Sequence, residues 1–279
     1  MSTTIRAGGA LATVRRETRA SYAFVERNIN LTKRYWGWEI AFLIYSAAAS
    51  MSIMFIGKAQ GGDEQTQLIL FLAIGTLVWS FLNSVFMNMA EMIAIERWEG
   101  TIEYTMMAPI SRLTHMFGQS VFSIVYGIIR SALLLGVLAL FFDINLAGAN
   151  LLGGLLVVVV GSLSFVGFGI MAAVLPLLFP EKGEQMTFII SSILLLVSGV
   201  YYPTDVLPGW MQVLSTLSPA TYVLEAMRSA LLDGASTLDL LPKMLPMLLI
   251  GVVTVPLGLV VFGYFERYAK RTGRLKRSG

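Results

Sequence analysis

Residues 96–112, ERWEGTIEYTMMAPISR, gather charged side chains between two long apolar runs. Carboxylates and arginines at this density can form ion pairs, bind a partner protein or take part in acid–base chemistry. Acid–base or nucleophilic catalysis would need a nucleophile–base pair or a cluster of carboxylates, and no such group accompanies the segment. The chain has no cysteine and a single histidine, His115, which excludes Cys-based and His-rich metal sites. We therefore expect no catalytic residue and no bound metal in this chain.

The spacing within this segment is helical. Apolar side chains four residues apart form one stripe, at Trp98, Ile102 and Met106. A second stripe holds Glu99 and Glu103. Pro109 should end the helix, and Gly100 costs about 1 kcal/mol relative to alanine inside a helix, so outside contacts must hold the helix together. The pattern predicts a short amphipathic rod with one face available for docking. A plain polar turn is the alternative, but turning needs fewer residues.

The elements around this segment are long apolar runs. Of the 279 residues, 56% are hydrophobic and only 13% are charged, whereas soluble domains carry about 25% charged residues. A helix needs about 17–25 apolar residues to cross roughly 30 Å of hydrocarbon. Six runs meet this length, at Glu39–Gly57, Leu68–Ala90, Met116–Phe142, Asn150–Phe179, Met186–Tyr202 and Met244–Phe265. The sequence thus predicts an all-α integral membrane protein with six transmembrane helices.

The basic residues predict the orientation of these spans. Sixteen of the twenty Lys and Arg fall on one side, at Arg6, Arg15, Arg16, Arg19, Arg27, Lys33, Arg34, Arg97, Arg112, Lys182, Arg267, Lys270, Arg271, Arg274, Lys276 and Arg277. The other side holds only Lys58, Arg228 and Lys243. The positive-inside rule therefore places both termini in the cytoplasm, and an even number of spans requires the termini to share a side. We expect a multi-pass protein of the cell inner (plasma) membrane. Its parts are a cytoplasmic segment, a transmembrane region and a basic cytoplasmic tail, at residues 1–38, 39–265 and 266–279.

The segment before the first span has its own pattern. Apolar residues recur at helical spacing, at Ala20, Phe24, Val25, Leu31 and Tyr35. Charged and amide residues occupy the opposite stripe, at Glu26, Arg27, Asn30, Lys33 and Arg34. This pattern is typical of a basic amphipathic helix in the inner membrane interface, and a generic anchor that only sets topology is the alternative. No apolar core with a small-residue cleavage site precedes it, so we expect no cleaved signal peptide.

Four residues in or near the spans are candidates for a translocation path. Arg130 lies fourteen residues into the third span, where an arginine costs about 2.5–3.5 kcal/mol and should face protein or water. We expect it to face a dimer cavity or to hydrogen-bond near Asn83 of the second span, and a purely structural pairing is the alternative. Tyr201 and Tyr202 end the fifth span, where they would line an exit gate or belong to an interfacial aromatic belt.

Residues 203–242 contain too many prolines and glycines to cross a membrane. We expect short helices there that dip into the outer leaflet from the extracellular side before the last span. Glu225 and Arg228 are three residues apart in this region, so they should pair on one helical face and stabilise that helix.

Two motifs carry a resemblance to a known family. The first is formed by Glu96, Arg97, Glu99, Gly100, Thr101 and Glu103, followed by Pro109, Arg112 and Gly118. It resembles the coupling-helix signature of the type-2 permeases of ATP-binding-cassette exporters, a group that includes daunorubicin-type drug exporters and polysaccharide and teichoic-acid exporters. The second motif, in SPATYVLEAMRSALL, resembles the stretch before the last span in that group and consists of Pro219, Tyr222, Glu225 and Arg228. The resemblance runs from about residue 20 to residue 271.

This resemblance implies a homodimer of six-span subunits bound to two copies of a cytoplasmic ATP-binding-cassette ATPase. Residues 96–112 would form the coupling helix that docks on the ATPase. The chain has no G-x-x-x-x-G-K-[ST] phosphate loop, so ATP and Mg²⁺ would belong to the partner. This chain is therefore expected to be neither an enzyme nor a cofactor-binding protein. Membrane lipids should surround it, and no nucleic acid is expected as a partner.

The residues leave the cargo open. An apolar, aromatic-rimmed cavity suits an amphipathic drug or lipid-like cargo, whereas the basic N-terminal helix also resembles the branch that exports lipid-linked polysaccharide or teichoic acid. Export as the direction of transport is implied by the resemblance alone. A secondary transporter would favour internal repeats and intramembrane carboxylates, and an intramembrane enzyme would need a catalytic constellation. The sequence favours neither.

Overall fold

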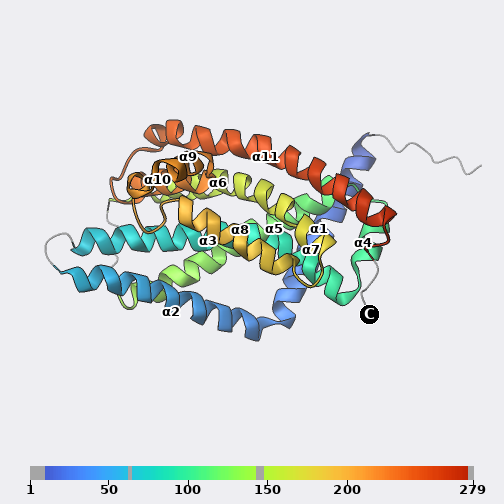
Figure 1. Cartoon of the computed structure of the whole chain (residues 1–279), viewed down its shortest axis with the longest axis horizontal. Coiled ribbons are helices and arrows are strands. Elements are labelled where there is room, and N and C mark those ends of the chain that lie inside the picture. Colours follow the sequence, from blue (N-terminus) through green and yellow to red (C-terminus); the bar gives the residue numbers. More distant parts are fainter. Residues whose placement is uncertain (1–9, 62–64, 143–147, 276–279) are drawn as a thin grey trace, which may run out of the picture.

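The structure is a computed structural model that describes residues 10–61, 65–142 and 148–275, so Arg6, Lys276 and Arg277 of the predicted basic ends lie outside the described residues. Within these ranges the regular structure is helical throughout, which confirms the all-α prediction (Figure 1). The elements are α1 (Ala10–Arg34), α2 (Trp36–Gln60), α3 (Gln65–Glu99), α4 (Ile102–Met107), α5 (Arg112–Ala139), α6 (Leu151–Ala172), α7 (Val174–Leu178), α8 (Gly183–Val197), the 3₁₀ turn η1 (Thr204–Val206), α9 (Gly209–Leu217), α10 (Pro219–Leu231) and α11 (Thr237–Arg271).

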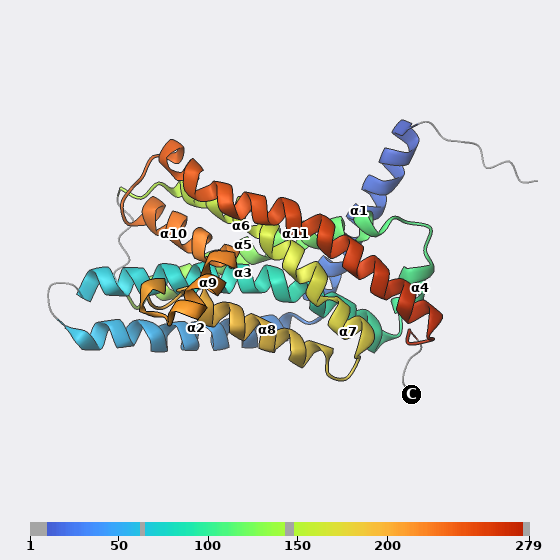
Figure 2. The same ribbon diagram turned by 45° about the horizontal axis from the view of Figure 1, so that its top comes forward.

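Long helices run side by side along the long axis of the molecule (Figures 1 and 2). Five helical stretches are long and apolar enough to cross a membrane, namely α2, α3, α5, α6 continued by α7, and α11. Helix α8 has 15 residues. At 1.5 Å per residue it spans about 22 Å, less than the roughly 30 Å of hydrocarbon. Of the predicted fifth span, Met186–Tyr202, only the part up to Val197 is helical.

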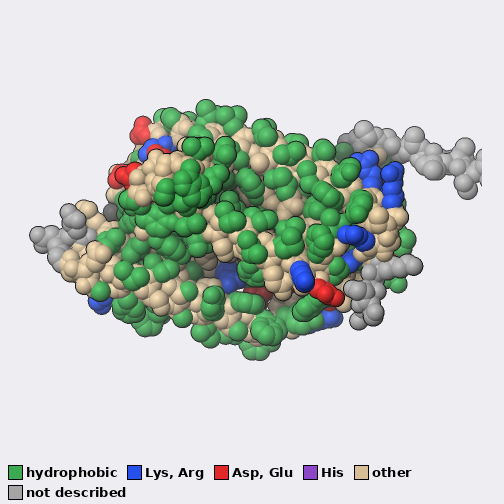
Figure 3. Space-filling view, viewed as in Figure 1, with side chains coloured by type: hydrophobic (Ala, Val, Ile, Leu, Met, Phe, Trp, Pro, Cys, Tyr) green, Lys and Arg blue, Asp and Glu red, His purple; other side chains and the backbone are tan. Residues whose placement is uncertain are grey.

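The two ends of this bundle differ. One end, which we call the α4 end, holds α4, α7, the start of α5 and the last turns of α11, whereas the opposite end holds α9 and α10 (Figure 2). In the space-filling view, apolar side chains cover most of the middle of the molecule, and Lys and Arg side chains gather towards the α4 end (Figure 3). This distribution agrees with the charge asymmetry predicted from the sequence.

The core is centred on α3, which packs against α2, α5, α6, α8 and α10. Phe86, Phe165 and Phe262 are among its fully buried side chains. Glycines let the long helices approach closely, because a methyl group at Gly258 of α11 would lie 2.9 Å from the carbonyl oxygen of Gly167 in α6. Small residues at such crossings are the common device for packing helices in lipid.

Residues 203–242 form η1, α9, α10 and the start of α11, so short helices occur where the sequence predicted them. Their depth in a membrane stays a prediction. Helix α10 begins with Pro219, at the first turn, where a missing N–H leaves no helical bond unmade. The last helix starts at Thr237, well before the predicted Met244, and it continues through Pro242.

Candidate functional site

The segment 96–112 is divided at Gly100. Helix α3 ends just before this residue, and Gly100 has a φ of 72°, in the left-handed region that glycine adopts without strain. The N–H of Thr101 donates to the carbonyl of Glu96 at 2.9 Å, and the N–H of Gly100 donates to the carbonyl of Arg97 at 3.2 Å. These two bonds form a Schellman cap. The single rod predicted for this segment is therefore wrong, because Gly100 ends α3 and α4 is a separate helix.

Helix α4 turns its apolar side chains into the protein. Ile102 and Met106 are each 2% exposed and belong to the main core. Trp98, the third member of the predicted stripe, is 77% exposed instead. The turn at Gly100 rotates α4 relative to α3, and this rotation separates Trp98 from the other two residues.

An outward surface remains, which we call the α4 face. It consists of the exposed side chains of Trp98, Glu99, Glu103, Tyr104 and Met107. Tyr104 is 74% exposed and Met107 is 70% exposed. Aromatic residues and methionine are enriched in the cores of protein interfaces. Pro109 is also exposed, in the segment that leads from α4 to α5.

Glu96, in the last turn of α3, is buried in an ionic cluster. Its side chain is 2% exposed, and its carboxylate forms an ion pair with Arg27 of α1. Nε2 of His115 in α5 lies 3.5 Å from the same carboxylate oxygen. The ring of Phe24 lies beside both partners, with its centroid 4.5 Å from that of His115 and 5.3 Å from the Arg27 guanidinium carbon. A buried carboxylate needs such partners, so Glu96 joins α3 to α1 and α5 and does not belong to the exposed surface.

Arg97 also points inward. It is 8% exposed, and its guanidinium donates to the carbonyl of Arg274 at 2.6 Å. Leu275 is 9% exposed, so the end of the described chain lies against the end of α3. Helix α11 continues to Arg271, so the predicted basic tail, 266–279, begins as helix, and Leu275 packs back on the protein while residues 271–274 are exposed.

A second ionic cluster, which we call the α11 clamp, holds the C-terminal end of α4. The carboxylate of Glu266 lies 2.7 Å from Nε of Arg112 and 2.7 Å from Nζ of Lys270. Arg112 donates to the carbonyls of Met106 at 2.7 Å and Thr105 at 3.2 Å, and Lys270 donates to the carbonyl of Met106 at 2.9 Å. Because the last carbonyls of a helix lack partners within it, cations there are favourable. The clamp thus attaches α4 to the last long helix.

Glu266 and Lys270 are not identifiable as site residues from the sequence alone. Their spacing of four residues, directly after an apolar run, is a usable signal that the helix continues beyond the predicted span. Their partner Met106 is 164 residues away from Lys270, and no local pattern indicates that contact.

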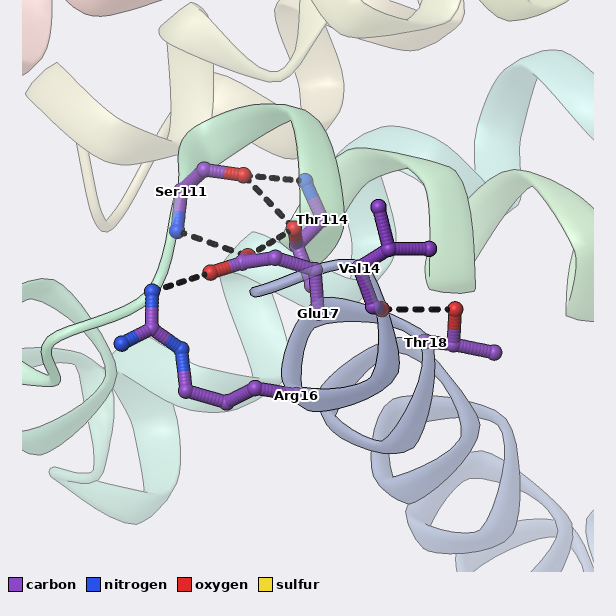
Figure 4. Close-up of polar contacts among 6 residues, drawn as sticks. All are labelled: Val14, Arg16, Glu17, Thr18, Ser111 and Thr114. Atoms are coloured by element: carbon purple, nitrogen blue, oxygen red, sulfur yellow. Dashed lines mark hydrogen bonds and ion pairs between the residues drawn. The ribbon is translucent and has the colours of Figure 1, made fainter. Parts of the chain in front are cut away.

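Helix α1 lies along the first half of α5, and Figure 4 shows one end of this contact. The Glu17 carboxylate accepts hydrogen bonds from the Thr114 hydroxyl, from the Ser111 N–H at 3.4 Å and from Arg16 at 2.9 Å. The Thr114 hydroxyl, followed by Arg16, lowers the pKa of Glu17 to about 2. Ser111 also caps α5, since its hydroxyl accepts from the Thr114 N–H at 3.0 Å. Glu17 therefore stays ionised at neutral pH and binds at the N-terminus of α5, where negative charge is favourable.

Further along, the contact between α1 and α5 is close. A methyl group at Gly118 would lie 2.5 Å from the carbonyl oxygen of Ser21, so only glycine fits there without a shift of α1. The buried amides of Asn28 and Gln119 hydrogen-bond at 2.7 Å. This close packing explains why the first motif has a glycine at position 118.

The predicted amphipathic helix is part of a longer one, because α1 covers Ala10–Arg34. Its predicted polar stripe is not wholly exposed, since Arg27 points into the protein towards α3. The position of α1 in a membrane interface stays a prediction.

The candidate path residues Arg130 and Asn83 are not brought together. Arg130 binds α2, where it donates to the Ser46 hydroxyl at 3.1 Å and to the Phe42 carbonyl at 3.3 Å. The amide oxygen of Asn83 accepts instead from the hydroxyl of Ser191 in α8. Of the alternatives predicted for Arg130, hydrogen bonding near Asn83 is therefore wrong, and its bonds are to α2 and to Tyr126 of its own helix.

The turn that follows α8 is held by Arg228. This arginine donates to the carbonyls of Gly199 at 3.2 Å and Val200 at 2.8 Å, and its guanidinium carbon lies 3.5 Å from the ring centroid of Phe71. Tyr201 packs against the main core, and the Tyr202 hydroxyl donates to a carbonyl of α8. The gate role of the two tyrosines stays a prediction.

The predicted pairing of Glu225 with Arg228 is wrong, because each residue has another partner. The Glu225 carboxylate lies 3.7 Å from Nζ of Lys243 in α11. The Tyr222 hydroxyl donates to the carbonyl of Thr216 in α9 at 2.8 Å. The second motif therefore joins α10 to α9, to α11 and to the turn after α8, and it does not stabilise α10 from within.

Comparison with known proteins gives a family model and two curated relatives. Two curated relatives are each described as a probable multidrug ABC transporter permease YbhR, from Escherichia coli strain K12 and from Escherichia coli O157:H7. Each is 26% identical to this chain over 175 residues, which are 63% of this chain and 46% of the relative. The chain thus spans about half the length of these relatives. The family model described as ABC-2 type transporter matches residues 20–232, most of the chain and both motifs. The chain belongs to the ABC-2 type transporter family.

Proposed function

We propose that this chain is the permease subunit of an ATP-binding-cassette exporter. Two copies form the export path in the inner membrane, and two copies of a separate ATPase subunit bind on the cytoplasmic side. ATP and Mg²⁺ bind to those ATPase subunits. The α4 end faces the cytoplasm, as do both termini, which agrees with the basic side chains gathered there (Figure 3).

The observation that carries this proposal is the α4 face. Trp98 is exposed in the last turn of α3, and Tyr104 and Met107 are exposed on α4, a helix of six residues whose opposite side is buried in the core. A cleft of about 450 Å³ adjoins it, lined by Glu99 and by residues of α1 that include Asn30 and Arg34. A rigidly held, exposed and partly apolar surface of this kind is suited to bind a partner protein.

The contacts on the inner side of the α4 face can transmit its movement to the long apolar helices. Chain continuity joins α4 to α3 and α5, the cluster around Glu96 joins α3 to α1, and the α11 clamp joins α4 to α11. When ATP binding closes the ATPase pair, the two α4 faces move towards each other and these helices move with them. Helix α8, which packs on α3, follows, and a path opens between the subunits towards the outer leaflet.

In this arrangement α8 is the fifth of six spans in spite of its length. Non-helical backbone is tolerated at membrane depth only where protein satisfies its polar groups. Arg228 supplies those bonds to the carbonyls of Gly199 and Val200, and Val200 is fully buried. The turn after α8 can therefore complete the crossing.

The cargo proposed is an amphipathic drug or lipid-like molecule. The description of the YbhR relatives as multidrug permeases supports it. Asn83, Arg130, Tyr201 and Tyr202 are proposed to line the path. Lipid-linked polysaccharide or teichoic acid is the second candidate, and the basic character of α1 is the observation that favours it.

The proposal is tested by co-purifying the permease with an ATP-binding-cassette subunit. Glu103→Arg, on the α4 face, should abolish co-purification. Asp205→Arg is the matched control, because it makes the same charge change on an exposed residue at the opposite end. Retention of the ATPase by the Glu103 variant, or equal loss in both variants, would contradict the proposed docking surface. Stimulation of ATP hydrolysis by drugs or by lipid-linked polysaccharide, in the reconstituted complex, then identifies the cargo class.

A further inference from the structure

Helices α1 and α2 meet at an open corner. The helical bonding is interrupted at Tyr35, between the end of α1 at Arg34 and the start of α2 at Trp36. The two helices then diverge, as both ribbon views show (Figures 1 and 2). Both contact α5, α1 along its first half and α2 further on, so α5 closes the third side of the corner.

A groove of about 560 Å³ occupies this corner. Apolar side chains from all three helices line it, among them Ile29, Leu43, Val125 and Ile129. Its volume lies within the roughly 300–1,000 Å³ typical of sites for small organic ligands. Ile129 is 57% exposed within it, so the protein leaves this apolar wall uncovered.

Two cations line the groove and take part in none of the ion pairs among the described residues, namely Lys33 at its edge and Arg130 on α5. Thr32 and Lys33 line it from the last turns of α1. The ion pairs among the described residues use Arg16, Arg27, Arg112, His115, Lys243 and Lys270, and Lys33 is in none of them. Glu39 and Arg130, which also line the groove, already have hydrogen-bond partners. Glu39 accepts from Tyr126, and Arg130 donates to both Tyr126 and Ser46.

Aromatic residues indicate where this edge lies relative to the membrane surface. Tyr35, Trp36 and Trp38 follow Lys33 and Arg34 in the chain and are 48%, 65% and 67% exposed. Exposed tryptophan and tyrosine at the start of a membrane span are typical of the membrane–water interface. The hydroxyl of Thr32 and the ammonium of Lys33 would therefore lie at headgroup level, with the apolar walls beside the acyl chains.

We propose that this groove binds an anionic glycerophospholipid of the inner leaflet. One acyl chain lies along α5 between Ile29 and Leu43, and the phosphate is bound by Lys33 and Thr32. Attraction between lysine and anionic headgroups, added to burial of the chain, provides the selectivity. A neutral amphiphile would leave Lys33 without a counter-ion, and a soluble anion would leave the apolar walls exposed. The bound lipid joins α1 to α2 across a corner where the protein itself leaves a gap.

The test is native mass spectrometry of the full permease released from vesicles that contain equal amounts of phosphatidylglycerol and phosphatidylcholine. The wild-type chain should retain phosphatidylglycerol over phosphatidylcholine by about fivefold or more. Lys33→Glu should remove that preference. Lys182→Glu is the matched control, because it makes the same charge change at an exposed position between α7 and α8 that does not line the groove.

A second variant addresses the apolar part of the site. Val125→Trp places a large side chain in the groove without changing charge, and it should lower retention of both lipids. If Lys33→Glu fails to fold, Thr32→Val combined with Lys33→Gln replaces it, with the same expected loss of preference. A phosphatidylglycerol with a photoreactive acyl chain should crosslink to residues 121–133 of α5.

Several outcomes would overturn the proposal. These are equal retention of the two lipids by the wild type, an unchanged preference in Lys33→Glu, an equal loss in Lys182→Glu, or crosslinking only outside the groove. A Val125→Cys variant that forms disulfide-linked dimers in lipid vesicles would show that a second copy of the chain covers the groove instead. The chain has no cysteine of its own, so such a disulfide is unambiguous. None of these measurements involves the ATPase, so they are independent of the proposed transport function.

Discussion

The carboxylate of Glu266 is shared by Arg112 and Lys270, and both cations also bind the last carbonyls of α4. Removing this one carboxylate leaves two cations close together with no counter-charge. A single substitution in a partly buried cluster of this kind has a large effect on stability. The attraction between the charges is lost, and the remaining charge is left buried without a partner.

Glu266→Gln should therefore lower the free energy of unfolding by about 2–3 kcal/mol. This is less than the roughly 3–5 kcal/mol expected when a fully buried pair is broken, since the Lys270 side chain is 40% exposed. The melting temperature in detergent measures it. Glu225→Gln is the matched control, because the Glu225 side chain is 59% exposed and its pair with Lys243 should contribute less than about 1 kcal/mol. Equal shifts for the two variants would show that the clamp contributes no more than an exposed pair.

The pKa of Glu17 gives a pH-dependent prediction at the same scale. Because the pKa falls from 4.5 to about 2 when α1 is docked, the ionised form favours docking, and this contribution is complete above pH 4.5. It should be lost as the pH falls from 4.5 towards 2. Spin labels at Thr13→Cys and Leu113→Cys should show a stable distance at neutral pH that broadens over this range. Glu17→Gln should show the broad distribution at neutral pH, and a wild-type distance that does not change with pH would contradict the assignment.

At the scale of elements, the break between α3 and α4 orients the α4 face. The predicted stripe of Trp98, Ile102 and Met106 assumes a continuous helix, whereas the chain is helical on either side of Gly100 and interrupted at Gly100 itself. What the spacing could not indicate is that Gly100 adopts a positive φ, since a glycine is compatible with a helix interior and with a cap. The two capping hydrogen bonds and the burial of Ile102 in the core stabilise the cap over a continuous helix.

Gly100→Ala should destabilise this break by about 1–2 kcal/mol, the cost of the left-handed region for a residue with a Cβ. Hydrogen exchange over residues 98–107 should increase, and binding of the ATPase should weaken with it. Gly37→Ala is the control, because Gly37 lies inside α2 and a methyl group there meets nothing within 4 Å. That variant should be neutral or slightly stabilising, by up to about 1 kcal/mol. Unchanged exchange in Gly100→Ala would mean that the cap does not determine the position of α4.

At the scale of the whole molecule, hydropathy predicted the helical class, and five of the six predicted spans coincide with helices long and apolar enough to cross a membrane. The exception, α8, is interrupted after Val197, where Gly199 and then Pro203 end the helix and Arg228 binds the turn. The contacts that hold the α4 end together were not predictable. Arg27, Glu96 and His115 come from three helices, and their partners are fixed by tertiary packing with no local pattern.

The proposed topology predicts which side of the membrane each loop faces. Single cysteines are informative because the chain has none. A membrane-impermeant maleimide should label Asp205→Cys in intact cells, and it should label Lys182→Cys and Tyr104→Cys only after permeabilisation. Labelling of Asp205→Cys and Lys182→Cys from the same side would show that α8 does not cross the membrane. Labelling of Tyr104→Cys in intact cells would contradict the cytoplasmic position of the α4 face.

The α11 clamp has a consequence for how the protein is made. Met106 leaves the ribosome 164 residues before Lys270, the residue that binds its carbonyl. At about 5–20 residues per second, α4 waits on the order of ten to thirty seconds for this partner. During that interval the end of α4 is held only by its own neighbours in the chain. The surface proposed to bind an ATPase therefore reaches its final form only after Lys270 has been synthesised.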